Sequence, residues 1–255
     1  MFVSESMYEL GSKRSAIREL FEYGKQQVAK VGAENVFDFS LGNPTVPSPA
    51  IVNETLKEIM DNNDSITVHG YTSAQGDVQT RKAIADYLNN TYGTHFTENN
   101  FYMTMGAAAS LSLCFKALTT SENDEFITIA PYFPEYNVFV ESSGAKLVVV
   151  SADTTNFQIN FDELEQKINK NTKGVIINSP NNPSGAVYSK ATIEKLASLL
   201  ERKSNEYNTQ IFIISDEPYR EIAYDGIEVP YVTKYYNNTL VCYSYSKSLS
   251  LPGER

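Results

Sequence analysis

The chain alternates short runs of aliphatic residues with longer amphipathic stretches, and the two patterns predict different elements. Within Lys190–Lys203, apolar residues recur at i, i+3, i+4 and i+7, which predicts one buried face of a helix. Short apolar runs bounded by turn residues predict strands. The predicted strands are Asn100–Thr104, Glu125–Ala130, Lys146–Val150, Gly174–Asn178, Ile211–Ser215 and Leu240–Tyr245.

Predicted helices separate most of these strands. They are Pro49–Asp61, Gln75–Tyr92, Ala107–Leu118, Tyr132–Ser143, Phe161–Ile168 and Lys190–Lys203. Alternation of strands and helices predicts an α/β domain with a mainly parallel sheet. The first forty or so residues carry one more predicted helix and the segment Phe37–Leu41, and we expect them to belong to a separate small lobe.

Composition narrows the class of protein. The 255 residues are 42% hydrophobic, which is enough for one or two globular domains, and no apolar stretch approaches the ~20 residues that span a bilayer. The net charge of -10 argues against nucleic-acid binding. Two cysteines and two histidines lie far apart, so neither a disulfide framework nor a metal site is expected. The first residues lack a secretory signal, and we therefore expect a cytoplasmic protein that acts on small molecules.

Residues that follow the predicted strands are the candidates for chemistry, because ligands of open α/β sheets lie outside the carboxyl ends of the strands. Gly106 begins a turn into a helix, where backbone N–H groups suit a phosphate, although an ordinary strand-to-helix turn has the same appearance. Phe133 could stack on a flat ring or could be a core aromatic.

Two further strand ends carry polar residues. The loop Asn178–Gly185 holds two prolines and three asparagines, which indicates either a simple loop or a rigid backbone that presents an amide. Asp216 ends an apolar strand, so it is expected to be either a helix N-cap or the partner of a cation. Facing a protonated pyridine nitrogen, this carboxylate would keep pyridoxal phosphate electron-withdrawing.

The last predicted strand leads to Lys247, which can form an imine with an aldehyde cofactor if its pKa is lowered. Ser244 and Arg255 could contact a phosphate. Ser244 and Lys247 also have the S-x-x-K spacing of penicillin-binding proteins and β-lactamases, but the S-D-N and K-T-G segments of those enzymes are absent from the sequence.

Taken together, these segments resemble class I and II aminotransferases, which are fold type I pyridoxal-phosphate enzymes. The resemblance runs over nearly the whole chain and rests on the order and spacing of short motifs. They are SLGNP at Ser40–Pro44, Tyr71 five residues before Gly76, GAA at Gly106–Ala108, PYF at Pro131–Phe133, NNPSG at Asn181–Gly185, DEPY at Asp216–Tyr219, and SYSK at Ser244–Lys247 with Arg255 eight residues later.

The resemblance implies a three-layer α/β/α sandwich with a mainly parallel sheet. Residues 1–48 are then expected to belong to a small domain and residues 49–255 to the large, cofactor-binding domain. The family normally continues beyond the arginine, through a last strand and a C-terminal small domain that carries the arginine for the substrate α-carboxylate. We therefore expect the fold to be incomplete at the C-terminus, and the 255-residue chain to be a fragment or a truncated product, unstable or inactive alone.

The resemblance also implies roles for single residues. Lys247 is expected to be the Schiff-base lysine and the base that moves a proton between the substrate Cα and cofactor C4′. Asp216 is expected to pair with the pyridinium nitrogen, Tyr219 and Asn182 to hydrogen-bond the phenolic oxygen, and Phe133 to stack on the ring. Lys247, Asp216 and Tyr219 are thus the expected catalytic residues.

The remaining implied contacts concern the phosphate and the substrate. The phosphate is expected to contact Gly106, Ala107, Ala108, Ser244 and Arg255. Tyr71 is expected to reach the phosphate of a neighbouring subunit, which implies a homodimer. Gly42 is expected near the substrate carboxylate through its backbone, and Asn182 is expected to bind the substrate as well as the cofactor.

The expected activity is transfer of an amino group between an amino acid and a 2-oxo acid in amino-acid biosynthesis. Aspartate is a family-level expectation for the substrate. A carbon-sulfur β-lyase on the same fold stays open, because only the steps after Cα deprotonation differ. A non-catalytic, cofactor-binding sensor domain of a transcription regulator is the second alternative, but only about forty residues precede Ser40, too few for a winged helix-turn-helix domain.

Overall fold

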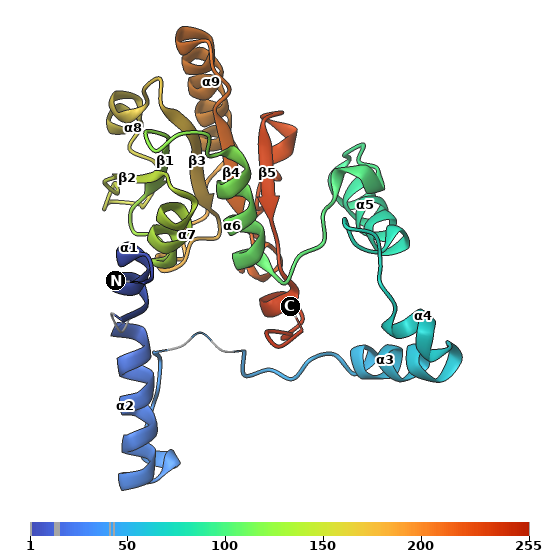
Figure 1. Ribbon diagram of the computed structural model, residues 1–255. Coiled ribbons are helices and arrows are strands. Elements are labelled where there is room, and N and C mark those ends of the chain that lie inside the picture. The colour runs from blue at the N-terminus through green and yellow to red at the C-terminus, as the bar shows by residue number, and fades with distance from the viewer. Residues whose placement is uncertain (1, 13–15, 41, 43, 255) are drawn as a thin grey trace. The chain divides into compact units, whose positions relative to one another are not determined.

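The computed structural model describes residues 2–12, 16–40, 42 and 44–254. The chain divides into two compact units, with the division between Pro47 and Ser48. The first unit holds helices α1 (Glu5–Ser12) and α2 (Ala16–Val31), followed by a 3-10 turn at Ala33–Asn35 (Figure 1). Its assignment to a small domain remains a prediction.

The second unit is built on a five-stranded sheet in which all neighbouring strands are parallel, in the order β2-β1-β3-β4-β5 (Figure 1). The strands are β1 (Glu125–Ile129), β2 (Lys146–Val150), β3 (Thr172–Asn178), β4 (Phe212–Asp216) and β5 (Thr239–Cys242). Because all five run in one direction, their carboxyl ends lie along one edge of the sheet.

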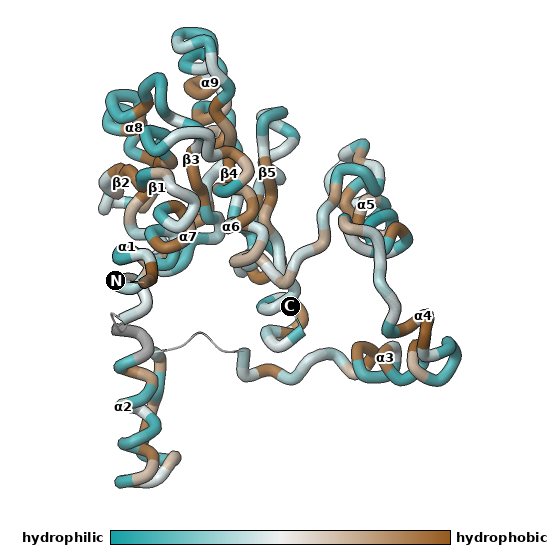
Figure 2. Tube along the Cα trace, viewed as in Figure 1, coloured by the Kyte–Doolittle hydropathy of each residue, from teal (hydrophilic) through white to brown (hydrophobic). Residues whose placement is uncertain are grey.

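Helices cover both faces of this sheet. Successive strand residues point to opposite faces, so Ile176 of β3 joins the cluster beneath α6 (Ala107–Leu118) and α7 (Glu135–Ser143), whereas Val175 joins the cluster beneath α8 (Phe161–Lys167) and α9 (Lys190–Tyr207). Figure 2 shows the apolar residues of β3 and β4 between these layers. The expected three-layer α/β/α sandwich is confirmed.

The other elements of this unit precede the sheet or follow its strands. Helices α3 (Ala50–Asn62), α4 (Ser65–His69) and α5 (Val78–Tyr92) precede it, and the short helix α10 (Tyr245–Ser248) follows β5. Three 3-10 turns lie at Glu98–Asn100, Arg220–Ile222 and Val232–Lys234. Among the described residues, no helix combines the length and the apolar character needed to cross a bilayer.

Most predicted elements agree with the structure, and their differences have local causes. Helix α5 begins at Val78 rather than at Gln75, because the Asp77 carboxylate caps it by accepting a hydrogen bond from the Thr80 N–H at 2.8 Å. The predicted strand Asn100–Thr104 is wrong. Its Met103 N–H donates to the Gln75 carbonyl at 2.9 Å, and no ladder forms with β5.

Candidate active site

Asp216 lies at the carboxyl end of β4 and is only 6% exposed. Its Oδ2 accepts a hydrogen bond of 2.6 Å from the hydroxyl of Tyr136, on α7, while Oδ1 is buried and has no hydrogen-bond partner among the described residues. Burial raises the pKa of this carboxyl to about 7, against the lowering effect of the Tyr136 hydroxyl. A cationic N–H donor placed at Oδ1 would satisfy the orphaned oxygen and restore the ionised form.

Asn178 connects the ends of β3 and β4. Its Nδ2 donates to the Asp216 carbonyl at 2.8 Å, and its Oδ1 accepts from the Asn182 N–H at 2.6 Å. These bonds attach the loop after β3 to the strand that carries the buried carboxylate. The backbone of Asn182 is therefore held at the sheet edge by the side chain of Asn178.

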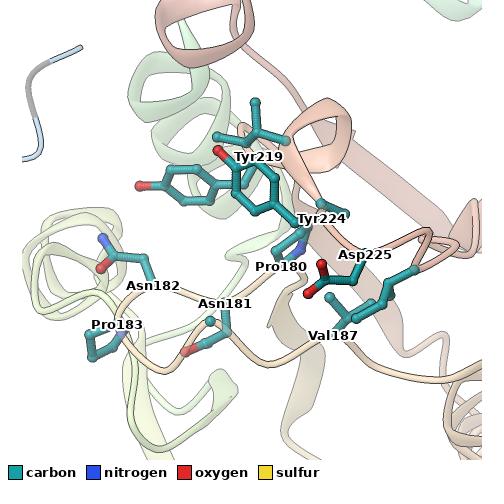
Figure 3. Close-up of a pocket in the computed structure, with 12 residues that line it drawn as sticks. Pro180, Asn181, Asn182, Pro183, Val187, Tyr219, Tyr224 and Asp225 are labelled. Atoms are coloured by element: carbon teal, nitrogen blue, oxygen red, sulfur yellow. The ribbon is translucent and has the colours of Figure 1, made fainter. Parts of the chain in front are cut away.

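Asn182 and Tyr219 come from loops after neighbouring strands. Burial raises the pKa of the Tyr219 hydroxyl, and the nearby Asn182 amide lowers it in part. Both residues line a cavity of about 440 Å³ whose other walls include Pro180, Tyr224 and Asp225 (Figure 3). The two residues expected to bind a phenolic oxygen thus share the wall of one cavity.

Lys247 lies on α10, directly after β5. The helix begins at buried Ser244, whose Oγ accepts from the Ser246 N–H at 3.1 Å and is 2.6 Å from the Ser246 hydroxyl. Burial lowers the pKa of Lys247, which increases the fraction of neutral amine at a given pH. An amine that forms an imine needs this neutral form.

Gly106 is the N-cap residue directly before helix α6. It is buried and adopts φ 87° and ψ 174°. Only glycine readily occupies this backbone region. The N–H groups of the first helical turn have no acceptor inside a helix, so those of Ala107 and Ala108 suit an anion at this end. The Thr104 and Ser110 hydroxyls lie 2.7 Å apart across the same turn and add polar atoms there.

Phe133 is partly buried after β1 and meets Tyr136 edge to face, with ring centroids 5.7 Å apart and an interplanar angle of 84°. Its ring is thus held by the residue whose hydroxyl contacts Asp216. Tyr136 thus contacts both the Phe133 ring and the buried carboxylate.

The remaining expected site residues are Tyr71, Gly42 and Arg255. Tyr71 is fully exposed in the segment after α4, so its side chain contacts none of the residues at the strand ends. Gly42 belongs to the first unit. Arg255 lies outside the described residues. Their expected roles remain predictions.

Sequence reasoning missed Tyr136 and Asn178. Tyr136 was placed only within a predicted helix, and nothing in the helical pattern indicates which residue of a distant strand its hydroxyl reaches. Asn178 is one of the three asparagines counted in the loop Asn178–Gly185, but the sequence indicates no separate role for it. The register between parallel strands, which pairs Asn178 with Asp216, is the observation that identifies it.

A buried ion pair that the sequence did not reveal fixes the segment after β4. Glu217 accepts from Arg220 Nε at 2.7 Å and from the Ser215 hydroxyl at 2.6 Å. The guanidinium of Arg220 also lies over the rings of Tyr231 and Tyr243, at 4.8 and 5.1 Å from their centroids. These contacts hold the backbone from Ser215 to Arg220, which contains Asp216 and Tyr219. The charge of Glu217 also raises the pKa of the neighbouring Asp216.

Solved structures with the same fold include an aminotransferase from Eubacterium rectale, which is 71% identical, with a TM-score of 0.98 over 100% of this chain and 64% of that one. An aspartate aminotransferase from Thermotoga maritima is 28% identical, with a TM-score of 0.84 over 98% of this chain and 64% of that one. The match covers the sheet and its flanking helices, as expected for the large domain of fold type I.

The sequence comparisons agree with the structural ones. An aspartate aminotransferase of Pyrococcus horikoshii is 33% identical over 95% of this chain and 58% of its own length. The chain thus spans about three fifths of the length of these relatives. Residues 34–255 match the family described as Aminotransferase class I and II. A match over so much of the sequence, with the strand-end residues arranged as described, shows that the chain belongs to the class I and II aminotransferase family.

Proposed function

We propose that this chain forms the cofactor-holding part of a pyridoxal-phosphate-dependent aminotransferase that moves an amino group between an amino acid and a 2-oxo acid. The observation that carries the proposal is the buried Asp216 carboxylate with its orphaned Oδ1. A protonated pyridine nitrogen supplies the cationic N–H that this oxygen lacks.

The residues at the strand ends fit the other parts of the cofactor. Asn182 and Tyr219, which line the same cavity, would donate to the phenolic oxygen. The first turn of α6 from Gly106, together with Ser244, would hold the phosphate, and Arg255 is proposed as a further phosphate ligand. Phe133 would cover one face of the ring.

When bound, pyridoxal phosphate supplies an aldehyde that condenses with amines and a ring that withdraws electrons from the substrate Cα. Lys247 would bind the aldehyde carbon and would move the proton at the substrate Cα as a general base. Burial assists both tasks, because the lowered pKa of Lys247 leaves more of its amine neutral. Asp216 would keep the ring nitrogen protonated.

Substrate and assembly are further parts of the proposal. The aspartate aminotransferases among the relatives support aspartate as amino donor in amino-acid biosynthesis, with Gly42 and Asn182 near the substrate carboxylate. The exposed ring of Tyr71 is available to a second subunit, which supports a homodimer. The chain has only two cysteines, too few for the disulfide framework of a small secreted domain, which supports the cytoplasm as its compartment.

A half-reaction tests the proposal. The full-length protein is loaded with pyridoxal phosphate, L-aspartate is added without any 2-oxo acid, and the cofactor spectrum and products are followed. We expect the cofactor to change from its aldehyde to its amine form with one equivalent of oxaloacetate released, and the Lys247→Arg variant to lose this conversion by at least about 100-fold. The other common amino donors are tested in the same way.

A carbon-sulfur β-lyase would give a different result. It would release ammonia and a 2-oxo acid from a sulfur amino acid, with the cofactor still in its aldehyde form. That outcome, or no cofactor conversion with any amino donor by a protein that binds the cofactor, contradicts the aminotransferase proposal. The names of the relatives do not favour the lyase.

A further inference from the structure

The chain has two cysteines, and they meet in the core. Cys114 lies on α6 and Cys242 ends β5, 128 residues later, yet their Sγ atoms are only 3.8 Å apart. Both pack in the apolar cluster formed with Phe115, Phe126 and Tyr136. Cys242 is 1% exposed, whereas Cys114 is partly exposed.

The two sulfur atoms are in contact but not at bonding distance. A disulfide needs its sulfur atoms about 2 Å apart, so the present pair must approach by a little less than 2 Å. The two cysteines stand on elements that already pack together, so the bond would join neighbouring elements.

The two thiols differ in reactivity in a way that suits sequential oxidation. The hydrogen bond with Cys242 lowers the pKa of Cys114, while the same contact and burial raise the pKa of Cys242 well above its usual value. Cys114 is therefore the thiol that ionises first, and it is also the one that solvent reaches.

We propose that Cys114 and Cys242 are a redox modification site that forms a reversible intrachain disulfide when the protein meets a hydroperoxide. The Cys114 thiolate attacks the peroxide, the O–O bond breaks, and Cys114 becomes a sulfenic acid while water or an alcohol leaves. The Cys242 sulfur then displaces hydroxide from Cys114, and the Cys242 proton leaves with it as water. The two sulfurs lose two electrons, which reduce the peroxide.

The disulfide joins α6 to β5. Helix α6 begins at Gly106 and β5 leads to Ser244, so the crosslink ties together two elements whose ends carry candidate site residues. The inference does not depend on the proposed function, because no atom of a cofactor or substrate takes part. Failure of the transamination test would leave it unchanged.

Mass spectrometry tests the proposal on the native protein. The reduced protein is treated with hydrogen peroxide, the peroxide is removed with catalase, and free thiols are alkylated with N-ethylmaleimide after denaturation. We expect untreated chains to take two labels and oxidised chains to take none, with a mass about 2 Da below that of the reduced chain, since two hydrogen atoms are lost. Digestion without reductant should release a linked peptide pair, and dithiothreitol should restore both labels.

The single variants Cys114→Ser and Cys242→Ser are matched controls. Each removes one sulfur, so neither can form the intrachain bond, and in Cys242→Ser dimedone should trap the sulfenic acid of Cys114. If a variant fails to fold, the labelling experiment on the unmodified chain is sufficient to test the proposal. Two labels retained after peroxide, oxidation of Cys114 to sulfinic acid with Cys242 still free, or a disulfide between two chains would each overturn the proposal.

Discussion

A carboxylate that is 6% exposed needs a donor for each of its oxygens, and Asp216 has one for Oδ2 alone among the described residues. Burial disfavours the charged carboxylate and therefore raises the pKa of Asp216 to about 7 in the cofactor-free protein. In the folded state this carboxyl keeps its proton over a pH range in which the unfolded chain has lost it. The Asp216 carboxylate is therefore suited to bind a cation and does not stabilise the cofactor-free protein at neutral pH.

The Asp216→Asn variant tests this property through its pH dependence. A raised folded-state pKa means that the stability contributed by protonated Asp216 is fully present below the unfolded value near 3.8 and is lost as the pH rises to about 7. Asparagine does not titrate. In urea unfolding of cofactor-free protein, we expect the variant to gain on the order of 2 kcal/mol relative to wild type between pH 5 and pH 8.

Asp162→Asn is the control for that experiment, because Asp162 is exposed on α8. Pyridoxal phosphate should stabilise wild type at pH 8 and should stabilise Asp216→Asn much less, since the neutral amide does not attract a pyridinium. Equal stability changes with pH in wild type and Asp216→Asn would show that Asp216 is not held in the protonated form.

At the residue scale, the sequence indicated which residues are candidates for the chemistry, but not which residues hold them in place. Asp216, Tyr219, Asn182 and Lys247 follow predicted strands, so their position at one edge could be deduced from the fold class. The contact of Tyr136 with Asp216 joins residues 80 positions apart and depends on how α7 packs on the sheet. No local pattern encodes that packing.

At the element scale, the start of α6 is the feature most sensitive to a small change. Gly106 has φ 87° and ψ 174°, so a Cβ there introduces strain of roughly 1–3 kcal/mol. We expect Gly106→Ala to lower the free energy of unfolding by about that amount, and to weaken binding of pyridoxal phosphate beyond this loss by displacing the first-turn N–H groups. Fluorescence titration with the cofactor and urea unfolding measure the two effects.

Gly93→Ala provides the matched control, because Gly93 also has a positive φ of 66° but ends α5. Both variants should lose stability, and only Gly106→Ala should lose cofactor affinity, by about 10-fold or more. Equal cofactor affinity in the two variants would exclude the start of α6 as the phosphate site.

The elements themselves were largely predictable, because strands buried on both faces appear as apolar runs and α9 has a clear helical period. The strand expected at Asn100–Thr104 shows the limit. Its residues suit a strand, but a strand also needs a neighbour to receive its N–H and C=O groups, and such a neighbour is a property of the whole sheet. Helix α4 was missed because five residues, Ser65–His69, are too few to show a period.

At the scale of the whole molecule, parallel topology explains how residues more than a hundred positions apart can form one site. Each strand of the sheet ends at the same edge, and the register pairs Asn178 with Asp216 and Asp216 with Cys242. The order of motifs along the chain could therefore predict which residues gather at that edge. The amino acid that is bound could not be predicted in this way, because no motif at the strand ends distinguishes one substrate side chain from another.

The covalent link to Lys247 is the central claim, because it unites the fold, the strand-end residues and the cofactor in one bond. The protein is loaded with pyridoxal phosphate, reduced with sodium borohydride, digested and mapped by mass spectrometry, with Lys247→Arg as control. The account predicts a phosphopyridoxyl group on the peptide that contains Lys247 and none in the control. A label on another lysine, or no label on a folded protein saturated with the cofactor, would contradict it.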